Sequence, residues 1–125
     1  MENIIERTRR KDITFYKSGR IDITARVARI LNLKQGDSIN ISKDENGEFL
    51  LFAQHNQFGR HCAKVYKTCC KGLNFRANSK KLYWSLVSIC EVKKTAEKVS
   101  FFCGEQTNIN NITYLPIITK LPIYE

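Results

Sequence analysis

The chain has 125 residues, of which 42% are hydrophobic and 26% are charged, so it is long enough for one globular domain and too apolar to be a disordered chain. Its formal net charge of +9 favours anionic partners such as nucleic acid or an acidic protein surface. The first residues mix acids with arginines and lack the apolar segment of a signal peptide. The longest mostly apolar stretch, Leu82 to Cys90, is too short to cross a bilayer. We therefore expect a cytoplasmic protein that does not engage a membrane.

Residues 1–11 are polar and read as a flexible arm. Apolar side chains then alternate with polar ones over residues 13–15, and again over residues 21–23. A period of two is typical of a strand with one buried face. Gly19 lies between the two runs and supplies the backbone freedom that a tight reversal needs. The pattern predicts a β-hairpin.

The period changes from Ala25 onward. Val27, Ile30 and Leu31 recur at helical spacing, which predicts a short amphipathic helix. Thr24 has a side chain suited to capping its start, and Gly36 breaks the pattern after its end.

A second hairpin follows this helix. Ile39 and Ile41 alternate with polar residues, and the apolar run over residues 49–52 lies beyond Asn46-Gly47. Asn-Gly is a strong hairpin signal because both residues tolerate positive φ.

The polar stretch over residues 54–60 is the best boundary in the chain. Beyond it the pattern predicts a strand (62–67), a helix (79–92), a strand (98–103), a turn (108–111) and a last strand (114–119) in which Pro116 marks an edge or a bulge. The sequence thus predicts an α+β fold: a hairpin–short helix–hairpin module over residues 12–54, then a β-α-β-β segment over residues 55–125. The second part packs on or beside the first, or forms one continuous domain with it.

Catalytic and metal-binding patterns are weak. The five cysteines have no C-x-x-C spacing and include one adjacent pair, which fits reduced thiols better than zinc ligands or a disulfide framework: Cys62, Cys69, Cys70, Cys90 and Cys103. His55 and His61 have no carboxylate at helical spacing. We expect no metal, no cofactor and no enzymatic activity.

One segment has a recognisable pattern. Gly19-Arg20 leads an apolar strand, a short helix follows with Arg29 and Leu31, and Gly36-Asp37 turns into the next strand. This order resembles the AbrB/MazE family of looped-hinge, swapped-hairpin DNA-binding modules, over about residues 12 to 53. The resemblance implies an intertwined homodimer that contacts DNA and acts as a transcriptional regulator or an antitoxin-like repressor. The resemblance nominates Arg20 and Arg29 for DNA contact. Two basic neighbours could add contacts, Lys17 on the turn and Arg26 on the helix.

Several positions depart from the family pattern: Thr24 replaces a proline, Ala28 replaces an arginine, and Asp22 adds a negative charge. The chain also has Ile13 or Thr14 where the family often has a basic residue early in the first strand. They motivate an alternative in which the hairpin fold serves dimerisation only and the protein is an adaptor for an acidic protein partner. In that case the second basic cluster would bind the acidic partner. In a third hypothesis, this cluster and the aromatic rings of Phe75 and Tyr66 together bind RNA. Its basic residues are Arg60, Lys64, Lys67, Lys71, Arg76, Lys80 and Lys81.

Overall fold

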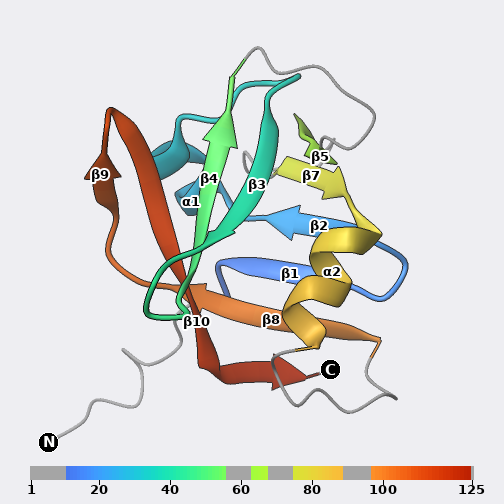
Figure 1. The fold of residues 1–125 in the computed structure, drawn as a ribbon. Helices are drawn as coiled ribbons and strands as arrows, with labels where there is room; N and C mark the ends of the chain where they lie inside the picture. Colours follow the sequence, from blue (N-terminus) through green and yellow to red (C-terminus); the bar gives the residue numbers. More distant parts are fainter. Residues whose placement is uncertain (1–10, 56–62, 68–74, 89–96, 125) are drawn as a thin grey trace, which may run out of the picture.

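The computed structural model describes residues 11–55, 63–67, 75–88 and 97–124 (Figure 1). The elements are β1 (Ile13–Tyr16), β2 (Arg20–Ile23), α1 (Ala25–Leu31), β3 (Ser38–Lys43), β4 (Phe49–Gln54), β5 (Ala63–Lys64), β6 (Tyr66–Lys67), β7 (Phe75–Asn78), α2 (Lys80–Val87), β8 (Lys98–Cys103), β9 (Thr107–Ile109) and β10 (Ile112–Tyr124).

Both predicted hairpins are present. β1 pairs with β2 in the register Ile13↔Ile23, and β3 pairs with β4 in the register Ile41↔Leu51. Gly19 closes the first turn with φ near +101°, a conformation that residues with a Cβ rarely adopt. These turns form where the local sequence signals them.

Each helix follows directly on a strand. α1 starts after Thr24, whose hydroxyl donates to the carbonyl oxygen of Asp12 instead of capping the helix, and α1 ends at Asn32 in the left-handed conformation. α2 starts after Ser79, whose Oγ accepts a hydrogen bond from the amide of Leu82 at 3.2 Å. None of the helices over the described residues has the length and apolarity needed to cross a membrane.

All pairings between the strands are antiparallel, and the main path of the sheet runs β5-β3-β4-β10-β8-β1-β2-β7-β6, with β9 paired to β10. One short segment joins its two ends, because β5 pairs with β3 and β6 pairs with β7. Between them Val65 donates its N–H to Asp37 O and accepts from the N–H of Gly36. The sheet therefore closes almost completely into a barrel-like shape (Figure 1).

The core fills the inside of this sheet. Strand alternation turns one side chain in two inward, and α1 and α2 add Val27 and Leu86. The largest fully buried side chains are Phe15, Phe101, Ile13, Ile21, Ile23, Ile39, Leu51, Leu86, Leu115, Val27, Val65 and Val99. The rings of Phe15 and Phe101 meet edge to face with centroids 5.8 Å apart. This interdigitated core fixes the register, and thereby which residues face out.

The predicted α+β fold class is wrong. The protein is mainly an antiparallel sheet, and the strands of the first two hairpins find partners in the second half of the chain. β1 pairs with β8, β2 with β7, and β4 with β10. The hairpin–helix–hairpin order is thus part of one larger sheet. Pro116 lies on β10, between β4 and β8, so it does not mark an edge; β10 does have a register shift, which falls between Ile118 and Ile123. Pairings between residues so far apart leave no local signature in the sequence.

Candidate nucleic-acid interface

The outer side of strands β8, β1, β2 and β7 carries polar side chains. The strand registers align them into two rows across the strands: Ser100, Thr14, Asp22 and Arg76 in one row, and Lys98, Tyr16, Arg20 and Asn78 in the other. We call these eight residues the polar face. It follows from strand alternation, since the residues between them point into the core.

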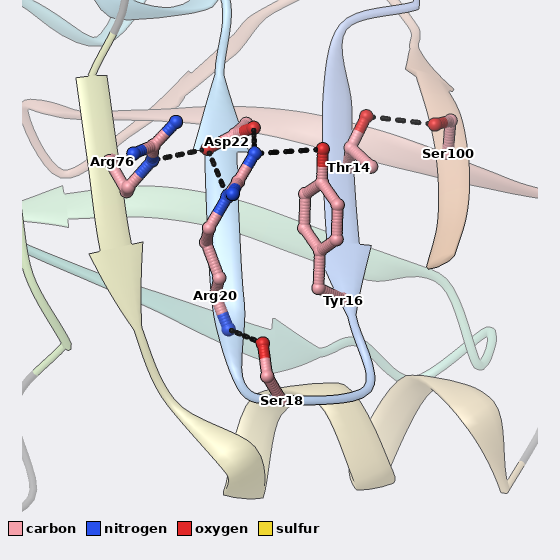
Figure 2. A network of polar contacts seen from close by, with 7 residues as sticks. All are labelled: Thr14, Tyr16, Ser18, Arg20, Asp22, Arg76 and Ser100. Atoms are coloured by element: carbon pink, nitrogen blue, oxygen red, sulfur yellow. Dashed lines mark hydrogen bonds and ion pairs between the residues drawn. The ribbon is translucent and has the colours of Figure 1, made fainter. Parts of the chain in front are cut away.

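Asp22 lies at the centre of the polar face, between two arginines (Figure 2). Its Oδ1 accepts hydrogen bonds from Nε of Arg20 at 3.3 Å and from Nε of Arg76 at 2.8 Å. Its Oδ2 accepts from Nη2 of Arg20 at 2.9 Å. A single carboxylate therefore holds two guanidinium groups that come from β2 and β7.

Tyr16 completes the cluster. The guanidinium carbon of Arg20 lies 4.1 Å from the centroid of the Tyr16 ring, and Nη2 of Arg20 donates to the Tyr16 hydroxyl at 3.0 Å. Nζ of Lys98 lies 5.7 Å from the same centroid. These contacts place cations around the ring in cation–π geometry. On the adjoining strands the hydroxyl groups of Thr14 and Ser100 are 2.8 Å apart (Figure 2).

The charges in this cluster reinforce one another. Burial alone would raise the pKa of Asp22, but hydrogen bonds from Arg20 and Arg76 and their positive charges hold that pKa below its ordinary value. The hydrogen bond to Asp22 in turn raises the pKa of Arg20. Both arginines thus stay paired with an ionised carboxylate at neutral pH, and the cluster retains a net positive charge.

The first predicted basic cluster is divided in the structure. Arg20 lies on the polar face, and Lys17 lies on the adjoining hairpin turn. Arg26 instead forms a 2.9 Å ion pair with the buried carboxylate of Asp12. Arg29 is exposed on α1.

The second predicted cluster is divided as well. Arg76 joins the polar face, whereas Lys67 lies with Arg29 around a hollow of about 250 Å³ beside α1. Lys80 packs against the hairpin turn, since a Cβ added at Gly19 would lie 2.8 Å from its Cγ. Lys64 is exposed on β5 and Lys81 lines a groove beside α2, whereas Arg60 and Lys71 lie outside the described residues.

Sequence reasoning missed two features of this site. It treated Asp22 as an obstacle to an anionic partner, whereas the structure makes it the group that orients both arginines. It also kept Arg20 and Arg76 in separate clusters, because they are brought together by the pairing of β2 with β7. The period-two alternation of the two strands puts Tyr16, Arg20 and Asp22 on the outer side of the sheet, so the sequence alone could have grouped these three residues.

Other candidate chemistry is limited. Nδ1 of His55 lies 2.8 Å from Oδ2 of Asp37, which also accepts the amide of Lys34, so this carboxylate supports a turn. His61 and Cys62 lie outside the described residues. No group of three or more potential metal ligands gathers within the described ranges.

Comparisons with known proteins add no constraint. No family model matches the chain, and no match was found among the curated proteins or the solved structures.

Proposed function

We propose that this protein binds duplex DNA through the polar face and acts as a small DNA-binding regulator. The observation that carries the proposal is the arrangement of Arg20 and Arg76 on either side of Asp22. The net charge of +9 favours an anionic partner in general, and this arrangement supports the polar face as the proposed binding surface.

The two guanidinium groups keep donors available for a ligand. Each guanidinium has five N–H groups. Arg20 uses Nε and Nη2, and Arg76 uses Nε, for contacts within the chain. Nη1 of Arg20 and both terminal nitrogens of Arg76 bond no residue that the structure describes. Such donors, held in fixed planes, suit phosphate oxygens or the edge of a guanine.

Partial exposure makes these donors accessible. The side chains of Arg20 and Arg76 are 39% and 32% exposed, and that of Asp22 is 30% exposed between them. Because the carboxylate orders both side chains before a ligand arrives, less rotamer entropy is lost on binding.

The aromatic residues favour a duplex over a single strand. Single strands are usually held by stacking bases on free aromatic rings. Arg20 lies over the ring of Tyr16, and Phe75 is 3% exposed, so neither ring offers an open platform. Tyr66 is exposed opposite Arg76, but one ring makes a poor stacking surface. A sheet face with fixed arginines suits backbone and groove contacts instead.

The proposal is tested by fluorescence anisotropy with labelled duplex and single-stranded DNA at physiological salt. The variant Arg20→Ala/Arg76→Ala should weaken duplex binding roughly a hundredfold, since each lost arginine contact costs about 1–3 kcal/mol. The matched control Lys34→Ala/Lys43→Ala removes the same charge from exposed sites outside the polar face and should weaken binding less than tenfold.

Three results would contradict the proposal. Equal losses in both double variants would mean that only total charge matters. Tighter binding of single strands than of duplex would favour the RNA-binding alternative. A failure to bind any nucleic acid would leave the adaptor hypothesis as the better account of the basic surface.

A further inference from the structure

The outer side of strands β4, β10 and β9 differs from the polar face in chemistry. It carries apolar side chains that we call the apolar face: Leu50, Phe52, Ile109, Ile112, Tyr114, Pro116 and Ile118. The register pairs Leu50 with Pro116 and Ile109 with Ile112, and the rings of Phe52 and Tyr114 lie 5.2 Å apart. The neighbours between them on β10, Leu115 and Ile117, point into the core.

Much of this surface is open to solvent. Ile109 is 46% exposed, Ile112 is 40% exposed and Ile118 is 38% exposed. Single exposed apolar side chains are common, but a contiguous apolar patch on a sheet face marks an interaction surface.

The segment that builds most of the face has no charge. Residues 106–119 contain no Asp, Glu, Lys or Arg, although 26% of the whole chain is charged. Proteins usually protect an edge strand with charged side chains or a covering element. β9 has all three side chains exposed, and among the described strands it pairs only with β10. No strand of the described part of the chain therefore covers its outer edge.

The net charge of the chain indicates which partner suits the uncharged apolar face. A chain of net charge +9 repels its own copies wherever lysines and arginines would meet. The uncharged apolar face is a surface on which two copies can meet without opposing like charges. An acidic partner would gain more from the basic clusters elsewhere. An edge strand can also pair antiparallel with its own copy around a two-fold axis.

We propose that the chain forms a homodimer in which β9 of one copy pairs antiparallel to β9 of the other, so that the β9 ends of the two apolar faces, with Ile109 and Ile112, lie side by side. This arrangement differs from the intertwined hairpins that the family resemblance implied, because both strands of the β1–β2 hairpin already pair within the chain, with β8 and β7. The proposal does not depend on DNA binding, and it leaves the polar face of each copy outside the interface.

The test is the molar mass of the full chain across a concentration series, measured by sedimentation equilibrium. Ile109→Lys/Ile112→Lys places charges at two exposed sites next to the proposed β9–β9 pairing, so that the same charges of the two copies lie side by side. The dimer dissociation constant should rise roughly a hundredfold or more, because like charges across an interface are strongly disfavoured. The control is Trp84→Lys, which adds one positive charge at an exposed apolar residue: Trp84 is 54% exposed on α2, on the opposite side of the molecule from β9 (Figure 1).

The expected results are a dimer for the natural chain and for Trp84→Lys, and a monomer for the isoleucine variant. A natural chain that stays monomeric, or a dimer that survives in the isoleucine variant, overturns the proposal. Loss of the dimer in Trp84→Lys overturns it as well.

Hydrogen exchange provides a readout without any substitution. The amides of Thr107–Ile109 should exchange at least tenfold more slowly as the natural chain passes from monomer to dimer, since an edge strand gains hydrogen-bond partners on pairing. Equal exchange at both ends of the concentration series contradicts the β9 pairing.

Discussion

Replacing Asp22 with asparagine separates geometry from charge at the polar face. The carboxylate accepts three hydrogen bonds, two from Arg20 and one from Arg76. Asparagine keeps one acceptor oxygen and presents an NH₂ group in place of the other, and NH₂ cannot accept. Each guanidinium therefore loses the charged partner that orders it, and the two positive charges lose the negative charge between them.

Two effects on DNA affinity oppose each other. Ordering two released arginine side chains on binding costs about 2 kcal/mol in total. Removing one negative charge at about 5 Å from a bound phosphate gains about 0.8 kcal/mol in water before salt screening. The difference of about 1.2 kcal/mol predicts that Asp22→Asn binds duplex DNA roughly eightfold more weakly.

The assay is fluorescence anisotropy at physiological salt, with Glu45→Gln as the matched control. Glu45 is exposed on the β3–β4 turn, and its substitution changes the net charge by the same amount. The control should bind as tightly as the natural chain or slightly more tightly. If Asp22→Asn also binds more tightly, by about fourfold, then charge alone governs binding and the positioning role of Asp22 is refuted.

Stability provides a second readout of the same substitution. Because the pKa of Asp22 is lowered in the folded state, its stabilising effect is complete above its ordinary pKa of 3.8 and is lost as the pH falls through the lower folded value. We expect Asp22→Asn to lower the free energy of unfolding by about 1 kcal/mol at pH 7, since the pairs are partly exposed. Urea unfolding should show this difference shrink below pH 3.8. A difference that persists at the lowest pH would contradict the assignment.

Substitutions at Gly19 and Asp12, each with a control, test the packing that positions the polar face. Gly19→Ala should lower the free energy of unfolding by roughly 2–3 kcal/mol in urea melts, because its φ is +101° and its Cβ would lie 3.2 Å from the Lys80 backbone nitrogen. The control is Gly36→Ala, at φ +92° with no atom within 4 Å of the added Cβ, which should lower the free energy of unfolding by only about 1 kcal/mol. Equal losses of stability in the two variants would refute the contact between Gly19 and Lys80. Asp12→Ala should cost roughly 2–3 kcal/mol, because the buried carboxylate accepts the amide of Cys103 at 2.7 Å. Asp12→Asn keeps an acceptor and should cost less; the opposite order in thermal or urea melts would be inconsistent with this role.

Local signals in the sequence predicted the parts of the fold that form locally. Gly19 and Asn46-Gly47 fix two turns, and the alternation around them fixes which side chains face the core. The same alternation places Tyr16 and Arg20 together on the outside. These features depend on residues within a few positions of one another, so a single sequence suffices to find them.

The closure of the sheet could not be predicted in this way. Thr14 meets Ser100 across 86 positions, and Asp22 meets Arg76 across 54. These contacts depend on how strands of similar apolar pattern sort themselves in the core, and many pairings satisfy that pattern equally well. The family resemblance ends near residue 53 and did not include the strands that complete the sheet. The second arginine of the candidate site lies on one of those strands.

The most direct test of the DNA-binding account is the affinity of Arg20→Lys/Arg76→Lys for duplex DNA at physiological salt. Lysine preserves the net charge of +9 but lacks the planar guanidinium that Asp22 orients. The account predicts that the folded double variant binds roughly tenfold or more weakly than the natural chain. An unchanged affinity would show that the positive charge is sufficient, and would contradict the proposal that two oriented arginines form the binding site.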